Sequence, residues 1–145
     1  MSDVVTAFAP ASIGNVAVGF DMLGLALADV GDRVVARRTE DRGVIVEEVR
    51  GLDGEKHPYL STNADENTAS IAALALLAEH GGDLGVALKV HKGIPLQSGM
   101  GSSAASAVAA VVAVNALLDT PLSSEALLPF ALEGERYASG GLHAD

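Results

Sequence analysis

The 145-residue sequence contains no cysteine and only five aromatic side chains. Without thiols it can form no disulfide scaffold, no zinc site built on thiolates and no cysteine nucleophile. Positive charge is also scarce, because 9 Lys plus Arg stand against 19 Asp plus Glu, for a formal net charge of −10. This excess of negative charge argues against nucleic acid or an anionic membrane as a partner.

Long apolar runs are missing as well. The most apolar stretch, residues 104–118, is rich in alanine and is interrupted by Ser106 and Asn115. It falls short of the ~18 continuous apolar residues that a membrane span needs. The N-terminus has no basic leader followed by an apolar stretch, so it does not resemble a signal peptide. Together with the absence of cysteine, these features predict a protein of the cytoplasm, a reducing compartment.

The composition of the whole sequence, 49% hydrophobic and 19% charged, is typical of a globular protein, and its length is typical of one domain. Short runs rich in Val and Ile predict strands at 3–9, 32–38, 43–50 and 84–90. The last of these alternates apolar and polar residues, which predicts a half-buried strand. Lys89, His91 and Lys92 near its end could favour a nucleotide phosphate in so acidic a chain, but they are interpreted as a solvated strand face and are assigned no role. Residues 14–24 are expected to form a glycine-rich loop, and the strands at 32–38 and 43–50 are expected to pair.

Helical spacing of apolar residues predicts three helices, at 65–80, at 104–119 and from about 123. Asn63 or Asp65 is expected to cap the first helix, and two glycines at 81–82 are expected to end it. Pro129 makes the third helix less regular, because proline removes a hydrogen bond from a helix interior.

One segment, residues 84–119, combines a strand, a glycine-rich loop and a helix. Gly99 and Gly101 lead to a helix start marked by Ser102 and Ser103. Unpaired N–H groups at a helix start attract anions, the helix dipole adds roughly half a positive charge, and glycines let a phosphate approach the backbone. Serine hydroxyls can bond a phosphate oxygen or ligate magnesium. The segment predicts a phosphate site, although an ordinary turn with a serine N-cap accounts for it equally well.

Three better-known motifs are excluded. A P-loop needs a lysine after its last glycine, and none follows Gly101. Gly99, Gly101 and Ala104 match a dinucleotide-binding fingerprint, but Asp119 ends a helix, whereas the ribose-binding acid must end a second parallel strand. A serine-hydrolase elbow is only approximated, because alanine replaces its last glycine and only two residues follow His143.

Residues 95–106, PLQSGMGSSAAS, resemble the ATP loop of the GHMP small-molecule kinases. Within that superfamily, residues 9–24 resemble the N-terminal signature of the homoserine kinases, and residues 133–145 resemble their glutamate-containing helix and SGxxHxD segment. The resemblance implies an α+β fold in which helices pack on a small mixed sheet. Homoserine kinases continue for about as long again. Residues 1–145 are therefore expected to form the N-terminal, ATP-binding domain, ending inside the HxDN motif without the family's C-terminal domain.

The activity that the resemblance implies is transfer of the γ-phosphoryl group of ATP to the side-chain hydroxyl of L-homoserine. The product, O-phospho-L-homoserine, serves threonine biosynthesis. ATP and Mg²⁺ are the implied cofactors, and a homodimer is the implied assembly. Phosphoryl transfer depends mainly on alignment and charge neutralisation, so no strong base is assigned. Two other functions stay open: another GHMP kinase acting on a different small alcohol, and a non-catalytic nucleotide-binding fragment.

The resemblance also implies site residues. Homoserine is implied to contact Asn15, Asp21 and His143. The catalytic metal site is implied to use Ser103 and Glu135, with Ser102 as the alternative serine. ATP is implied to contact one residue outside the loop and a continuous run within it: Asn67, Pro95, Leu96, Gln97, Ser98, Gly99, Met100, Gly101, Ser102, Ser103, Ala104 and Ala105.

The residues themselves permit simpler interpretations beside these. Asp21 is the only charge between Asp3 and Asp29 and lies in an apolar run, where a carboxylate needs a cationic partner such as a substrate ammonium. It could equally cap a turn of its own backbone. Glu135 could be a solvated helix residue, and Asn67 could be a helix cap.

Overall fold

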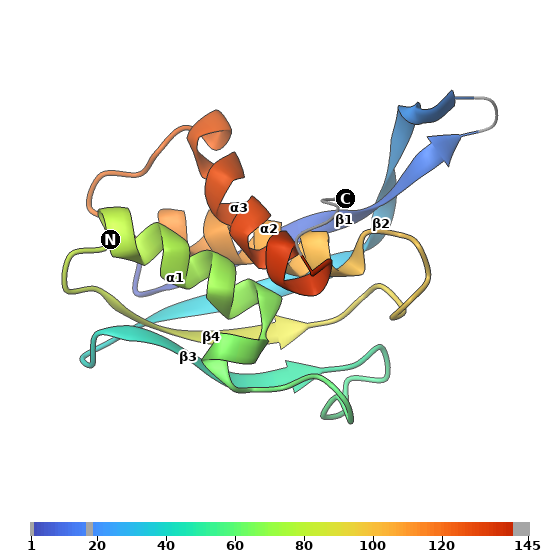
Figure 1. Ribbon diagram of the computed structural model, residues 1–145. Coiled ribbons are helices and arrows are strands. Elements are labelled where there is room, and N and C mark those ends of the chain that lie inside the picture. The colour runs from blue at the N-terminus through green and yellow to red at the C-terminus, as the bar shows by residue number, and fades with distance from the viewer. Residues whose placement is uncertain (1, 17–18, 141–145) are drawn as a thin grey trace.

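The computed structural model describes residues 2–16 and 19–140, with the backbone only at residues 19–21. Within this part, three helices cover one face of a four-stranded sheet (Figure 1). The elements are β1 (Val4–Val16), β2 (Gly19–Thr39), β3 (Gly43–Arg50), the 3₁₀ turn η1 (Ala64–Glu66), α1 (Thr68–His80), β4 (Gly85–His91), α2 (Ser102–Asn115) and α3 (Ser124–Ala138). The expected α+β fold with a small mixed sheet is confirmed.

The strands lie in the order β1-β2-β4-β3. β2 pairs antiparallel with β1 and with β4, whereas β3 and β4 are parallel. The predicted pairing of 32–38 with 43–50 is therefore wrong, because β4 lies between these two strands. α1 connects β3 to β4, and such a helical crossover is what allows consecutive strands to lie parallel and side by side.

The central position of β4 also changes its burial. The strand is buried at every position from Gly85 to Leu88, so the prediction of a half-buried strand is wrong. Ala87 is 1% exposed although it faces away from the helices. It pairs in register with Arg37 on one side and Ile45 on the other, and their longer side chains flank it. A small residue between two long neighbours is covered without being part of the main core.

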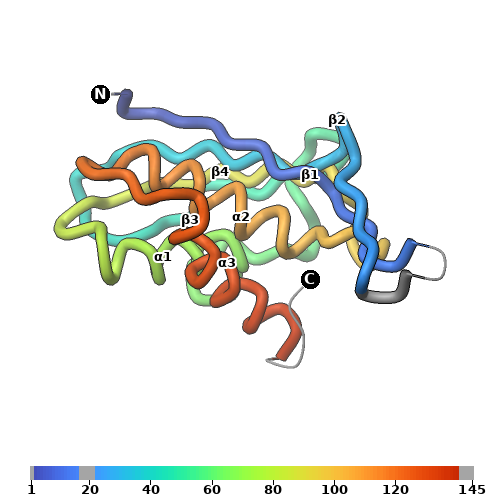
Figure 2. Tube along the Cα trace, turned by 90° about the horizontal axis from the view of Figure 1, so that it is seen from above, coloured from blue at the N-terminus to red at the C-terminus, as the bar shows by residue number. Residues whose placement is uncertain are grey.

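β1 and β2 form a hairpin whose far end extends beyond the helical layer (Figures 1 and 2). The predicted loop at 14–24 is therefore wrong, since most of these residues are strand. Pro10 does not end β1, because β1 is an edge strand and proline is tolerated where no ladder hydrogen bond is required. Register shifts after Pro10 and after Ile13 bend the hairpin.

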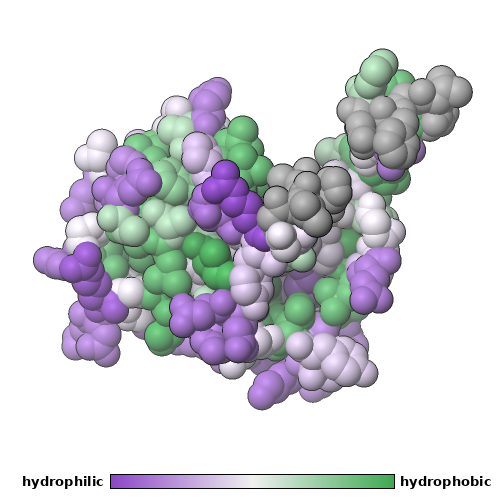
Figure 3. Space-filling model, viewed as in Figure 1, coloured by the Kyte–Doolittle hydropathy of each residue, from purple (hydrophilic) through white to green (hydrophobic). Residues whose placement is uncertain are grey.

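Apolar side chains gather on this hairpin as well as over parts of the helical layer (Figure 3). Met22 is 84% exposed, and Leu23 and Leu25 are more than half exposed. They point away from the core because the hairpin has left the helical layer that buries the rest of the sheet. The core itself lies between the sheet and the helices and consists of small aliphatic residues such as Val34, Val86, Leu88 and Val114.

The helix boundaries follow from side chains that bond to the backbone. Asn63 caps η1 instead of α1, and Asn67 caps α1, its Oδ1 accepting a hydrogen bond of 3.0 Å from the Ala69 N–H. α1 ends before Gly81, as predicted. α2 ends at Asn115, earlier than predicted, because the Asn115 amide exchanges two hydrogen bonds with the Leu122 backbone and so turns the chain.

Pro129 lies inside α3, which continues without interruption. Its position in the first half of the helix removes one N–H, and the rest of α3 is held by packing on α1 and α2. Among the described helices, none combines the length and the apolar character that would be needed to cross a membrane.

Gly134 sets how closely α3 approaches the other helices. A Cβ at this position would lie 2.6 Å from the Thr68 carbonyl oxygen, 3.0 Å from the Ala107 Cβ and 3.2 Å from the Ala72 Cβ. The missing side chain therefore lets α3 contact both α1 and α2. This contact also fixes the depth at which the neighbouring residue, Glu135, is buried.

We expect Gly134→Ala to lower the free energy of unfolding by about 1–3 kcal/mol, because the added methyl group meets backbone and must push α3 outward. This loss outweighs the gain of up to ~1 kcal/mol that alanine brings to a helix. Urea unfolding followed by circular dichroism measures the difference. Leu128→Ala on the exposed face of α3 is the control, since Leu128 is 60% exposed. Equal midpoints for the two variants would show that the helices do not need this close contact.

Candidate functional site

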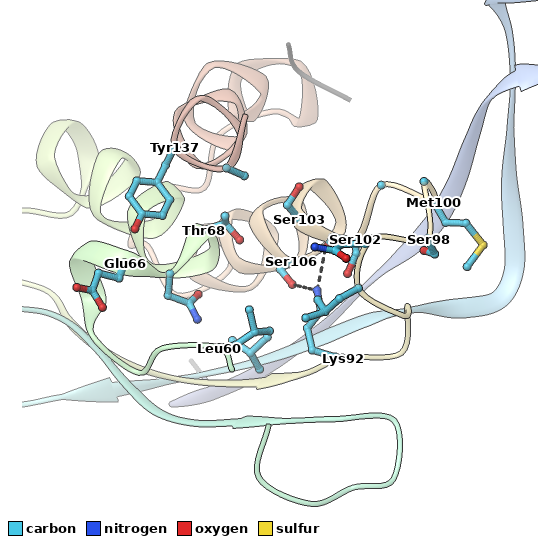
Figure 4. A pocket seen from close by; sticks show the side chains of 17 residues that line it. Leu60, Glu66, Thr68, Lys92, Ser98, Met100, Ser102, Ser103, Ser106 and Tyr137 are labelled. Carbon is cyan, nitrogen blue, oxygen red and sulfur yellow. Dashed lines mark hydrogen bonds between the residues drawn. The ribbon is translucent and has the colours of Figure 1, made fainter. Parts of the chain in front are cut away.

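A cavity of about 420 Å³ opens at one end of the helical layer (Figure 4). Its wall is formed by the loop after β4, the first turns of α2, the start of α1 and the end of α3. Of the residues predicted to bind ATP, the wall contains Asn67, Leu96, Gln97, Ser98, Gly99, Met100, Gly101, Ser102 and Ser103. Pro95, Ala104 and Ala105 are not among the lining residues, and Ala105 is buried in the core instead.

The loop from residue 93 to residue 101, called the phosphate loop below, has an unusual backbone. Gln97, Gly99 and Gly101 have φ angles of 57°, 71° and 66°. Gly101 is the N-cap of α2 in the left-handed conformation, and a Cβ there would lie 2.7 Å from the Ser12 Oγ. The Ser12 N–H donates a 3.1 Å hydrogen bond to the Met100 carbonyl oxygen. A glycine is required at position 101 for both conformation and space.

The N-terminus of α2 faces this cavity with its backbone donors available. Gly101 makes no side-chain capping bond, and the first turn contains no acidic residue. Ser102 and Ser103 therefore belong to the first turn, and the simpler interpretation of an ordinary serine N-cap is wrong. The positive end of the helix dipole and the first N–H groups of α2 together provide a site for an anion. The Ser103 side chain lines the same cavity.

Lys92 and Asp32 form a buried ion pair directly behind this helix start, which sequence reasoning missed. Asp32 is fully buried and Lys92 is 6% exposed. The Lys92 ammonium donates to the Asp32 carboxylate, to the Ser102 carbonyl oxygen at 2.8 Å and to the Ser106 Oγ at 2.7 Å. Burial lowers the pKa of the Lys92 ammonium, and the attraction of Asp32 opposes that shift.

The interpretation of Lys92 as part of a solvated strand face is therefore wrong. Lys89 does lie on such a face, close to Glu47 and Glu48 and about half exposed. A signal for the buried pair was present in the sequence. Asp32, Val34 and Ala36 occupy every second position of β2 and therefore share one face of the strand, and all three are buried. A carboxylate that begins an inward-facing row needs a buried cation.

Glu135 lies on α3 and is 4% exposed, so it is not a solvated helix residue. Among the described residues, its Oε1 is the buried side-chain polar atom that has no hydrogen-bond partner. A buried carboxylate oxygen without a partner is costly unless a cation neutralises it. The Lys92 ammonium does not supply a hydrogen bond to Glu135, because its three hydrogens are donated to Asp32, Ser102 and Ser106. Glu135 is itself absent from the cavity wall, although Tyr137 and Ala138 on the same helix contribute to it.

A magnesium ion fits this donor set. Mg²⁺ binds few protein oxygens and completes its shell with phosphate oxygens and water. The described residues contain no cluster of three or more His, Asp or Glu side chains that could hold a metal on its own. The orphaned carboxylate oxygen of Glu135 and the hydroxyl of Ser103 in the cavity wall are oxygen donors of the kind that suits an ion brought by a nucleotide.

The sequence profile of the GHMP kinases N terminal domain matches residues 67–145, the part of the chain that contains the phosphate loop, α2 and α3. The chain belongs to the GHMP kinase family. The predicted resemblance is thereby confirmed, and the glycine-rich loop and uncapped helix lie inside the matched region.

Among the relatives of this GHMP kinase chain are proteins named homoserine kinase. The chain is 50% identical over 139 residues to a homoserine kinase of Xanthomonas campestris pv. campestris (strain B100), covering 96% of this chain and 42% of the relative. It is 46% identical to a homoserine kinase of Chloroherpeton thalassium over an alignment of 153 positions, gaps included. This alignment covers 97% of this chain and 46% of the relative. The crystal structure of a homoserine kinase from Cytophaga hutchinsonii superposes with a TM-score of 0.86 and 44% identity, covering 97% and 43%. The chain therefore spans less than half the length of these relatives.

Asn67 has a structural task in this GHMP kinase domain. It is 6% exposed, its Oδ1 caps α1, and its Nδ2 donates a 3.0 Å hydrogen bond to the Ser61 carbonyl oxygen. It also lines the cavity. The interpretation as a helix cap is confirmed, and contact with ATP stays a prediction.

The three residues predicted to bind homoserine are not brought together by the part of the chain that the structure describes. Asn15 lies in the hairpin, in register with Phe20 and outside the cavity wall. Asp21 belongs to β2, but its side chain lies outside the described atoms. His143 lies outside the described residues altogether. Their assignment stays a prediction.

Proposed function

We propose that this chain is the ATP-binding part of a homoserine kinase. The enzyme transfers the γ-phosphoryl group of ATP to the side-chain hydroxyl of L-homoserine and releases O-phospho-L-homoserine for threonine biosynthesis. The observation that carries the proposal is the uncapped start of α2, reached through a glycine loop and opening on a cavity of about 420 Å³. Relatives named homoserine kinase at 50% and 46% identity support the choice of substrate. We place the reaction in the cytoplasm, in keeping with a sequence free of cysteine.

In this proposal the first turn of α2 binds the phosphates. Backbone N–H groups of the phosphate loop and of α2 donate to phosphate oxygens, and the helix dipole stabilises their negative charge. The nucleobase occupies the more apolar part of the cavity, where Leu60, Leu96 and Tyr137 contribute to the wall. Phosphoryl transfer requires mainly alignment and charge neutralisation, both of which a rigid loop and a helix start provide.

Ser103 and Glu135 are the residues that we propose to hold Mg²⁺. The bound ion would neutralise charge on the phosphate oxygens. Ser103 reaches the cavity with its hydroxyl, and Glu135 supplies the buried carboxylate oxygen that has no other partner among the described residues. Asn15, Asp21 and His143 are proposed to bind homoserine, with the Asp21 carboxylate as partner of the substrate ammonium.

Calorimetric titration of the 145-residue chain with ATP tests the proposal, after circular dichroism has shown that the chain is folded. We expect saturable binding that becomes tighter when Mg²⁺ is present. AMP is the matched control ligand, because it lacks the β- and γ-phosphates, and we expect it to bind more weakly and without dependence on Mg²⁺. A folded chain that does not bind ATP, or that binds ATP and AMP equally, would contradict a phosphate site at the start of α2.

A further inference from the structure

One carboxylate joins the two ends of the phosphate loop. At the first residue of the loop, the Gly93 N–H donates a 2.9 Å hydrogen bond to Oδ1 of Asp32. Beyond the last residue of the loop, the Ser106 hydroxyl on α2 donates a 2.6 Å hydrogen bond to Oδ2 of the same carboxylate. The Lys92 ammonium, next to Gly93, donates to Asp32 and also to the Ser102 carbonyl oxygen at 2.8 Å. Figure 4 shows Lys92 between the loop and Ser106.

Lys92 lines the cavity, but its ammonium group has no hydrogen left for a ligand. An ammonium carries three hydrogens, and all three are donated to Asp32, Ser102 and Ser106. Its side chain is 5% exposed and that of Asp32 is fully buried. Lys92 therefore acts on a bound phosphate through the backbone that it holds and not by direct contact.

Such an anchor restrains a loop whose glycines leave its backbone many conformations. The loop contains three glycines and three residues with positive φ, and each flexible residue loses conformational entropy when a ligand orders it. Apart from the Asp32 network, three hydrogen bonds of the described residues hold the loop. The Met100 carbonyl oxygen accepts from the Ser12 N–H at 3.1 Å, the Gly101 carbonyl oxygen accepts from the Ala105 N–H at 2.9 Å, and the Ile94 carbonyl oxygen accepts a long bond of 3.4 Å from the Ser102 hydroxyl. Backbone donors that are ordered before binding give higher affinity for phosphate.

We propose that Asp32 is a positioning residue that, through Lys92 and Ser106, clamps both ends of the phosphate loop and thereby sets the affinity of the site for the polyphosphate part of a nucleotide. This inference rests on the proposed function, since it assumes that the loop binds phosphates. A buried ion pair is often no more stabilising than apolar residues of the same volume. Its presence behind the loop fits a demand for exact loop geometry better than a demand for stability.

The test compares Asp32→Asn and Ser106→Ala with the wild-type chain. Ser106→Ala removes two hydrogen bonds of the clamp without leaving a buried charge unpaired, so it stays informative even where Asp32→Asn does not fold. Glu47→Gln is the matched control, because Glu47 is a carboxylate on the same sheet that pairs with Arg37 on the surface. Each chain is titrated with MgATP and with AMP, and amide hydrogen exchange is followed without ligand over residues 93–106.

We expect Ser106→Ala to weaken MgATP binding by about tenfold, because it removes both hydrogen bonds of the Ser106 hydroxyl in the clamp, and Asp32→Asn to weaken it further. AMP binding should change less than twofold, and hydrogen exchange should rise over residues 93–106 but not over β3 or α1. Glu47→Gln should behave as wild type. Unchanged MgATP affinity in folded clamp variants would overturn the inference, and so would an equal loss for ATP and AMP. Failure of the wild-type chain itself to bind MgATP would overturn both this inference and the proposed function.

Discussion

Replacing Glu135 by glutamine is expected to stabilise the ligand-free chain while removing most of the effect of Mg²⁺ on ATP binding. The buried Oε1 of Glu135 has no hydrogen-bond partner among the described residues, and the Lys92 ammonium attracts this carboxylate only through space. The wild-type carboxylate is therefore a cost to folding until a cation binds it directly. A neutral amide of the same shape lowers that cost, and we expect the free energy of unfolding to rise by about 1–3 kcal/mol. Functional sites commonly trade stability for activity in this way.

The same substitution removes the charged oxygen that we propose as a metal ligand. We therefore expect the tightening of ATP binding by Mg²⁺ to fall by tenfold or more, the effect that loss of ~1.4 kcal/mol or more would have. Urea unfolding without ligand and calorimetry with and without Mg²⁺ measure the two effects. Glu133→Gln is the control, because Glu133 lies on the same helix but pairs with Arg136 on the surface. If Glu135→Gln destabilised the chain or left the Mg²⁺ effect intact, Glu135 would have a structural role.

Replacing Lys92 by methionine is expected to have the largest effect on stability. Methionine has a similar volume but leaves the Asp32 carboxylate buried without its cation, and it removes three hydrogen bonds. Breaking a buried pair by removing one partner costs about 3–5 kcal/mol. Because small domains are stable by only about 5–15 kcal/mol, this variant should unfold at a markedly lower urea concentration.

Two further variants show whether the loss comes from the unpaired charge. Lys89→Met removes a lysine that is about half exposed and lies near Glu47 and Glu48, and it should cost about 0–1 kcal/mol. The double variant Asp32→Asn with Lys92→Met removes both charges and should recover much of the stability that Lys92→Met loses. Similar unfolding midpoints for Lys92→Met and Lys89→Met would mean that the pair at the start of α2 is not buried in solution.

Local features of the sequence predicted the elements that depend on neighbours along the chain. The strand before the loop, the loop itself and the helix after it were all located from the spacing of glycine, serine and apolar residues. α1 was predicted to end at Gly81 because glycine follows the last apolar position, and it does. Hydrogen bonds within a helix and positive φ angles in a loop are decided over a few residues, so the sequence contains the necessary information.

Contacts between distant segments were beyond such reasoning. Residues 14–24 were expected to be a loop because glycine weakens a strand, but pairing along the β1–β2 hairpin supplies the missing hydrogen bonds. β3 was expected beside β2, yet the crossover through α1 places β4 between them. Strand pairing depends on which edges meet in space, and several arrangements satisfy the same local pattern.

The candidate site likewise has a part that the sequence predicted and a part that only the tertiary structure shows. The sequence by its own patterns predicted an anion site at the start of a helix, because backbone donors, dipole and glycines all lie within one short segment. Only the tertiary structure joined Asp32 to Lys92 across 60 residues, and only the approach of α3 at Gly134 buried Glu135. Burial depends on which surfaces pack together, and burial determines whether a charged side chain is solvated, paired or left in need of a ligand.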